Sequence, residues 1–314
     1  MRPVDDHIAS VQNGELGLRM KIGIVLPQGW VQEYAGWDPA QAWARTVELA
    51  RQSERLGFES VWLYDHFQTF PRPTDEITFE AFTGLSALAT LTSRVRLGHL
   101  VLCAGYRNPA LVAKMIGTLD VISGGRIDLG IGAGWKQDEF LAYGYGFPSL
   151  ADRLGLLADS LEIIRAMLGP GRATFSGAHA RVEDAVNLPK GLQEPRVPIM
   201  VGGNGPRVTW RLAARHADEL NLDNAGPEEV RAALPVIADR CREIGRDPDS
   251  LRLSCLAPRV RADTAGKERR ELLASYRAAG LHRVMLMLRS SVHGDEALER
   301  LAEDATAAGA ELMR

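Results

Sequence analysis

The chain has 314 residues, of which 25% are charged, and its formal net charge is −3 at pH 7. That length suits one large domain with a sizeable core, and the balanced charge excludes a global basic field for nucleic acid. The apolar runs are far too short to cross a bilayer, so we expect no membrane partner.

The amino-terminal stretch differs from the rest of the chain. Residues 1–19 carry three acidic side chains and no apolar centre, which is unlike a secretory signal, so we interpret them as a flexible extension before a single domain at 20–314. Cys103, Cys241 and Cys255 include no Cys-x-x-Cys pair, which favours free thiols in the cytoplasm. The histidines never pair at ligand spacing, so no metal site is expected.

Short β-branched runs alternate with longer helical patterns along the chain. Strands are predicted at 21–26, 60–64, 95–102, 126–130, 199–202, 219–222, 252–256 and 283–288. Eight such units predict an α/β fold of the TIM-type (β/α)8 barrel class with insertions at the carboxyl-terminal mouth. A doubly wound sheet is the alternative, but no linker divides the strands.

The helices between these strands have recognisable ends. Asp38 and Pro39 are typical of a helix start, and Gly57 of its end. The most regular helix follows Ser149, with one apolar stripe formed by Leu150, Leu154, Leu157, Leu161, Ile164 and Leu168. Residues 66–79 and 169–198 are insertions, and 173–182 within the second suit a short hairpin.

Three strand ends carry candidate chemistry. Asp65 and His66 follow the second strand, where a carboxylate can orient a ring and a histidine can transfer a proton; a loop cap and a structural histidine are the plainer alternative. The fourth strand ends in the small residues 132–134, which leave room for a ring against the backbone, or simply allow a tight turn. Their spacing is not the dinucleotide fingerprint.

The fifth strand leads into the glycine-rich turn 202–207, and then into a helix beginning near Val208. Such a turn at a helix amino terminus exposes backbone N–H groups beside the positive end of the dipole. Arg207 can add a charge-assisted contact. This turn is therefore predicted to bind a phosphate group.

Together these stretches resemble the luciferase-like superfamily of flavin and deazaflavin oxidoreductases, from Met20 onward. The resemblance is carried by SVWLYDH (60–66), SRVRLG (93–98), RNPA (107–110), ISGGR (122–126), LGIGAGW (129–135) and VGG (201–203). In detail the chain is similar to the actinobacterial subgroup that uses coenzyme F420, through PQGW (27–30), YDHF (64–67) and YGYGF (143–147). The resemblance implies a TIM-like barrel, a homodimer, and a cofactor at the carboxyl-terminal mouth.

It also implies roles for particular residues. Asp65 would contact the cofactor ring, and His66 would be the catalytic proton donor or acceptor beside the reacting centre. Further cofactor-binding positions are Leu100, Val101, Cys103, Ala133, Gly134 and Asp138, with a non-proline cis peptide expected at Leu100-Val101. The phosphate side would be held by Gly203, Asn204, Gly205, Arg207 and Val208. An apolar substrate pocket would be shaped by Trp30, Tyr106, Trp135 and, more weakly, Phe147.

Two departures from the family pattern bear on the substrate. Where the sugar-phosphate dehydrogenases of the family have a catalytic glutamate, this chain has Trp135, which disfavours sugar-phosphate oxidation; Glu139 does not inherit that role by default. A threonine of some relatives is Cys103 here, which loses a hydroxyl donor and keeps the small size.

The function expected from these features is hydride transfer between reduced F420 and a small organic substrate, with His66 handling the proton. An FMN-dependent monooxygenase that uses O2 is the first alternative, since a deazaflavin has carbon at position 5 and resists reaction with oxygen. A non-catalytic flavin-binding protein is the second.

Overall fold

The computed structural model describes residues 19–257 and 264–313. The extension expected at 1–19 therefore lies, except for its last residue, outside the described residues. In the part of the chain that is described, none of the helices has the length and apolar character that crossing a bilayer requires.

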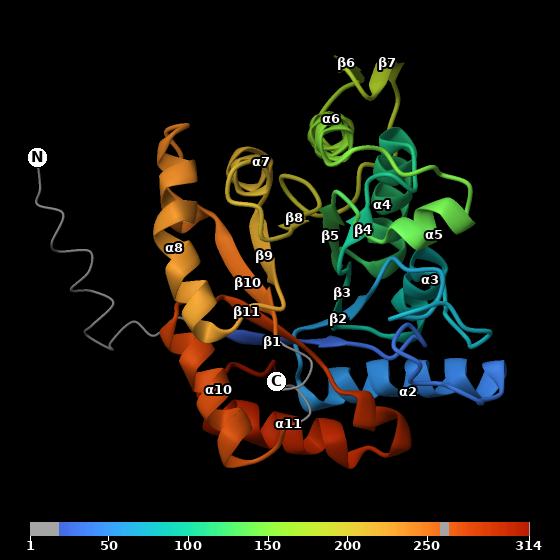
Figure 1. Cartoon of the computed structure of the whole chain (residues 1–314), viewed down its shortest axis with the longest axis vertical. Helices are drawn as coiled ribbons and strands as arrows, with labels where there is room; N and C mark the ends of the chain where they lie inside the picture. The colour runs from blue at the N-terminus through green and yellow to red at the C-terminus, as the bar shows by residue number, and fades with distance from the viewer. Residues whose placement is uncertain (1–18, 258–263, 314) are drawn as a thin grey trace, which may run out of the picture.

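A closed parallel barrel forms the centre of the molecule (Figure 1). Its strands are β1 Lys21–Val25, β2 Ser60–Leu63, β3 Arg96–His99, β4 Leu102–Cys103, β5 Ile127–Gly132, β8 Ile199–Gly202, β9 Glu219–Asp223, β10 Arg252–Leu256 and β11 Arg283–Met287. The order is β3-β2-β1-β11-β10-β9-β8-β5-β4, and a further pairing of β3 with β5 closes the ring. Closure confirms the predicted barrel and excludes the doubly wound sheet.

Helices surround the strands on the outside of the barrel (Figure 1). They are α2 Pro39–Leu56, α3 Ala81–Leu91, α4 Pro109–Ser123, α5 Gln137–Ala142, α6 Leu150–Leu168, α7 Thr209–His216, α8 Pro227–Arg242, α10 Lys267–Ala278 and α11 Glu296–Ala307, with 3-10 turns at Pro248–Ser250 and Arg289–His293. The apolar faces of helices and strands meet in one large core cluster between the two layers. Strand ends thus converge at one mouth, where the loops after the strands can build a site.

The predicted helix ends are confirmed. Asp38 accepts hydrogen bonds from the N–H groups of Ala40 and Gln41 at the start of α2, and Gly57 ends that helix in a left-handed conformation. Ser149 caps α6 by accepting from the N–H of Asp152. The sequence alone can predict these helix ends, because each capping residue contacts only backbone a few residues away.

The structure corrects two details and confirms a third. The strand expected at 95–102 is interrupted by the cis peptide Leu100-Val101, and divides into β3 and β4. The apolar stripe of α6 is buried from Leu157 onward, but Leu150 in the first turn is 60% exposed because it projects over the barrel mouth. The hairpin expected within the second insertion is present as β6 Ala173–Ser176 and β7 Arg181–Ala185.

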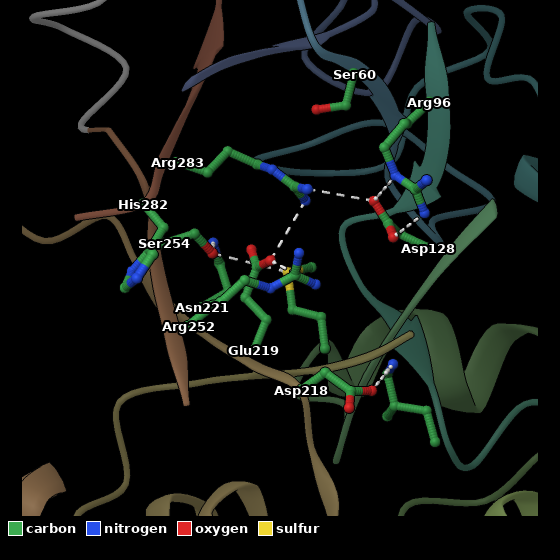
Figure 2. A network of polar contacts seen from close by, with 12 residues as sticks. Ser60, Arg96, Asp128, Asp218, Glu219, Asn221, Arg252, Ser254, His282 and Arg283 are labelled. Atoms are coloured by element: carbon green, nitrogen blue, oxygen red, sulfur yellow. Dashed lines mark hydrogen bonds and ion pairs between the residues drawn. The ribbon is translucent and has the colours of Figure 1, made fainter. Parts of the chain in front are cut away.

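The amino-terminal end of the barrel holds a buried network of charges (Figure 2). Arg283 on β11 reaches Glu59 at 2.9 Å, Asp128 at 3.4 Å and Glu219 at 3.5 Å. Arg96 on β3 forms a second ion pair with Asp128 at 2.6 Å. The carboxylates raise the pKa of Arg283 against the opposing effect of burial. This end of the barrel is therefore filled by paired charges, and the open end is the carboxyl-terminal mouth.

Candidate functional site

A cavity of about 600 Å3 opens at the carboxyl-terminal ends of the barrel strands. Most of the site residues expected from the sequence line it: Trp30, Asp65, His66, Leu100, Val101, Cys103, Tyr106, Ala133, Gly134, Trp135, Gly203, Asn204 and Gly205. They come from loops that follow different strands, as in other barrels of this class. Asp138, Arg207, Val208 and Phe147 are described by the structure but lie off the cavity wall.

The floor of the cavity is set by the break between β3 and β4. The peptide Leu100-Val101 is cis, as the resemblance implied. A Cβ added at Gly132 or Gly202 would lie 2.9 Å from a methyl group of Val101. Gly134 has φ +77°, and a Cβ there would lie 2.4 Å from the sulfur of Cys103. Val101 and Cys103 thus fill the space that was expected beside Gly132 and Gly134. The backbone of these two glycines still lines the cavity.

Asp65 is held by protein groups at the end of β2. Its carboxylate accepts two hydrogen bonds from Arg107, at 2.7 and 2.9 Å, and one from the N–H of Cys103 at 2.8 Å. Arg107 also contacts Glu80, the N-cap of α3, at 2.7 Å. Burial raises the pKa of Asp65, and the paired Arg107 opposes that shift. Asp65 therefore fixes the loop after β4, and Arg107 is a partner that the sequence did not reveal.

His66 has a defined orientation beside the cavity. Its ring stacks on Trp30 with centroids 4.5 Å apart and planes 4° apart. Its Nδ1 lies 2.8 Å from Oε2 of Glu139. The ring nitrogen left for the cavity is Nε2, so the histidine can exchange a proton with a bound molecule there.

Glu139 on α5 is a residue of the site to which the sequence analysis assigned no role. Its side chain is fully buried and accepts hydrogen bonds from His66, the Tyr106 hydroxyl, and the N–H groups of Phe67 and Gln68, at 2.8, 2.9, 2.8 and 3.2 Å. Burial opposes ionisation, but these hydrogen bonds outweigh it and lower the pKa of Glu139. In the sequence, Glu139 is an acidic residue next to the apolar Phe140 on a short helix. That pattern does not distinguish Glu139 from its neighbour Asp138.

Asp138, expected to bind the cofactor, instead points to the surface. Its side chain is 47% exposed and pairs with the ammonium of Lys136 at 2.6 Å. Lys136 is buried and lines the cavity. Asp138 thus lies away from the cavity, because α5 turns Glu139 and Phe140 inward.

The glycine turn after β8 forms the polar end of the cavity. Gly203, Asn204 and Gly205 line it together with Thr209, the first residue of α7. Asn204 ties the turn to β9 through two hydrogen bonds with the backbone of Asp223, at 2.7 and 2.9 Å. Val208, the N-cap residue of α7, makes no side-chain capping hydrogen bond, and the N–H of Trp210 donates to the carbonyl of Gly205 at 3.0 Å. Free N–H groups at a helix start are suited to an anion; Arg207 and Val208 are exposed beside it.

Comparison with known proteins places the chain among luciferase-like enzymes. Residues 20–314 match the model of the luciferase-like monooxygenase family. The chain is 32% identical over 232 residues to an F420-dependent glucose-6-phosphate dehydrogenase of Intrasporangium calvum, covering 72% of this chain and 67% of that protein. It is 30% identical over 225 residues to a 5,10-methylenetetrahydromethanopterin reductase of Methanolobus tindarius, covering 72% and 63%.

The alignments to such relatives span from half to about two thirds of their length. Among solved structures, an F420-dependent secondary alcohol dehydrogenase in complex with an F420-acetone adduct is similar, with a TM-score of 0.78 and 19% identity. That match covers 92% of this chain and 99% of the other. At this identity the similarity supports the barrel fold.

Proposed function

Because the chain belongs to the luciferase-like monooxygenase family, we propose that it is an F420-dependent oxidoreductase which transfers a hydride between the reduced deazaflavin and a small organic substrate. The observation that carries the proposal is His66, held by Glu139 at one nitrogen and facing the cavity with the other. Relatives named as F420-dependent support the choice of cofactor.

The cavity has the chemistry that a ring system with a phosphate-bearing tail needs. The apolar part of the cavity wall includes Leu100, Val101 and Leu256. Gly203 and Thr209 line the uncapped start of α7, where a phosphate would accept backbone hydrogen bonds. These residues would hold the cofactor, and Asp65 would act indirectly by fixing the backbone of Cys103.

When bound, the reduced deazaflavin supplies the hydride. The protein supplies orientation and the proton. As an imidazolium, His66 holds that proton at Nε2 while Nδ1–H donates to Glu139, and Trp30 fixes the ring plane. Cys103 takes no part as a nucleophile, since burial raises the pKa of its thiol to about 12.

The test is a fluorescence titration of the apo-protein with F420 and, in parallel, with FMN. We expect F420 to bind more tightly, with substrate turnover that consumes no oxygen. Tighter binding of FMN with stoichiometric oxygen uptake would overturn the proposal in favour of a monooxygenase. Tight F420 binding without turnover of any compound would favour a non-catalytic binding protein.

The proposal includes a homodimer located in the cytoplasm. Exposed apolar side chains on the surface support the dimer: Leu111 and Ile122 on α4 are 52% and 49% exposed, and Leu188 and Leu192 in the insertion 169–198 are 66% and 58% exposed. The two segments are adjacent, because Lys114 on α4 donates a hydrogen bond to the carbonyl of Leu188. Light scattering of the purified chain measures its oligomeric state directly, and a monomer at micromolar concentration would contradict the proposed dimer.

A further inference from the structure

We infer that the substrate end of the cavity takes an uncharged, flat, conjugated ketone, and that phosphorylated or carboxylated compounds are excluded from it. The inference deepens the proposed function and rests on it. It follows from the exposed apolar rim of the cavity, the arrangement of aromatic rings around His66, and the pairing of the basic groups described at this end.

The rim of the cavity consists of large apolar side chains that remain exposed. Trp135 after β5 is 57% exposed and Leu150 at the start of α6 is 60% exposed, yet both line the cavity. Apolar surface at the edge of a pocket gains free energy when a ligand covers it, roughly in proportion to the area removed from water. The rim therefore favours a ligand whose body is apolar and extends across both side chains.

The rings around His66 favour a flat ligand. Trp30 covers one face of the imidazole, and Trp135 meets it edge-on with centroids 5.8 Å apart and planes 76° apart. Phe70 supports both indoles, with centroids 5.2 Å from Trp30 and 5.9 Å from Trp135. Rings held at fixed angles offer faces and edges to another ring, and give a flat conjugated compound more contact than a puckered sugar.

The charges at this end are already paired within the protein. Lys136 and His66 are basic residues of the cavity wall: the ammonium of Lys136 contacts Asp138 at 2.6 Å, and Nδ1 of His66 contacts Glu139 at 2.8 Å. Arg107, behind the wall, is held by Asp65 and Glu80. A phosphate or carboxylate that binds here loses its hydration shell. On the described part of the wall, no unpaired cation compensates for that loss. The uncapped start of α7 is the anion-binding feature of that wall, and the proposed function assigns it to the cofactor.

The reaction balances for such a ketone. A hydride from the reduced deazaflavin adds to the carbonyl carbon, and the proton on Nε2 of His66 goes to the carbonyl oxygen. The C=O double bond becomes a C–OH single bond, the ketone gains two electrons, and the deazaflavin is oxidised by the same two. His66 then recovers a proton from water.

The experiment uses 2-acetylnaphthalene, its 6-carboxylate derivative and glucose 6-phosphate as probes. Binding of each to the protein with oxidised F420 bound is measured by calorimetry, and oxidation of reduced F420 is followed by its absorbance. We expect the neutral ketone to bind at least about tenfold more tightly than its carboxylate, and to be reduced. Glucose 6-phosphate should neither bind nor be oxidised with oxidised F420.

Trp135→Ala and Leu150→Ser should each weaken binding of the ketone, by about tenfold for the larger indole, with Trp135→Phe recovering most of the loss. Leu141→Ser is the matched control, because Leu141 on α5 is 56% exposed and lies outside the cavity wall. Equal binding of ketone and carboxylate, or turnover of glucose 6-phosphate, would overturn the inference while F420 binding still upheld the proposed function. Failure of F420 itself to bind would defeat the proposed function first.

Discussion

At the scale of single residues, the pair formed by Glu139 and His66 determines what the site can do. A buried carboxylate 2.8 Å from Nδ1 fixes which ring nitrogen faces the cavity. The three other hydrogen bonds to Glu139 anchor the carboxylate itself, so that the imidazole is held by a rigid partner. Glu139 lies behind the residues that line the cavity and acts through His66, so it is a positioning residue.

Glu139→Gln tests this role. The lowered pKa of Glu139 keeps it ionised throughout the neutral range, so a negative charge stands beside the protonated ring. Glutamine can offer Nδ1 either its carbonyl oxygen or its amide NH2 group, so the orientation of the His66 ring is no longer fixed. We expect kcat to fall by about tenfold to a hundredfold with F420 binding unchanged.

Glu296→Gln is the control for this variant, since Glu296 forms a surface pair with Arg300 and its replacement should leave both kcat and F420 binding unchanged. A Glu139→Gln enzyme with an unchanged kcat, or with F420 binding weakened as much as kcat, would show that Glu139 contributes only packing.

At the scale of elements, the proposed cofactor site depends on the backbone conformation of the glycine turn between β8 and α7. Gly203 has φ +133°, a backbone conformation that other residues rarely adopt, and a Cβ there would lie 3.3 Å from a methyl group of Thr209. The turn presents the uncapped start of α7 to the cavity, and its shape depends on this position.

Gly203→Ala should therefore weaken F420 binding by about tenfold or more, and lower the free energy of unfolding by about 1 kcal/mol. Gly245→Ala is the matched control: Gly245 has φ +71°, lies after α8, and a Cβ there meets none of the described atoms within 4 Å. It should show a similar loss of stability in urea and no change in F420 affinity. Equal affinities in the two variants would remove the turn from the cofactor site.

At the scale of the whole molecule, the two ends of the barrel divide stability from function. The charges around Arg283 close the amino-terminal end (Figure 2). The guanidinium carbon of Arg283 lies 5.2 Å from the ring centroid of Trp62. The cavity lies at the opposite ends of the same strands. A change in the network should therefore alter folding without altering the shape of the site.

Arg283→Met should lower the free energy of unfolding by about 3–5 kcal/mol, because Glu59, Asp128 and Glu219 lose a buried counter-charge. Arg252→Met is the control: its side chain is 42% exposed and 3.6 Å from Glu219, so about 1 kcal/mol or less is expected. Urea unfolding measures both. A loss for Arg283→Met no larger than that of the control would mean that the network contributes little.

The sequence by itself determined the barrel, most strand positions and the region of the site. Strand and helix periodicities and caps such as Asp38 depend on residues close in the chain, and a parallel barrel brings all the strand ends to one mouth. His66 and the turn at 203–205 could therefore be placed near each other without any knowledge of packing. The family match over residues 20–314 confirms the resemblance that the sequence showed from Met20 onward.

Only the tertiary structure decided which polar groups meet. Glu139 reaches His66 across 73 positions of sequence and Arg107 reaches Asp65 across 42. Which acid of α5 points inward depends on the rotation of a short helix, and Asp138 and Glu139 look alike in a linear pattern. Likewise, the filling of the space beside Gly134 by Cys103, and the exposure of Leu150, depend on how separate loops pack over the mouth. Local patterns carry no information on these long-range contacts, because their energies arise only when the chain has closed the barrel.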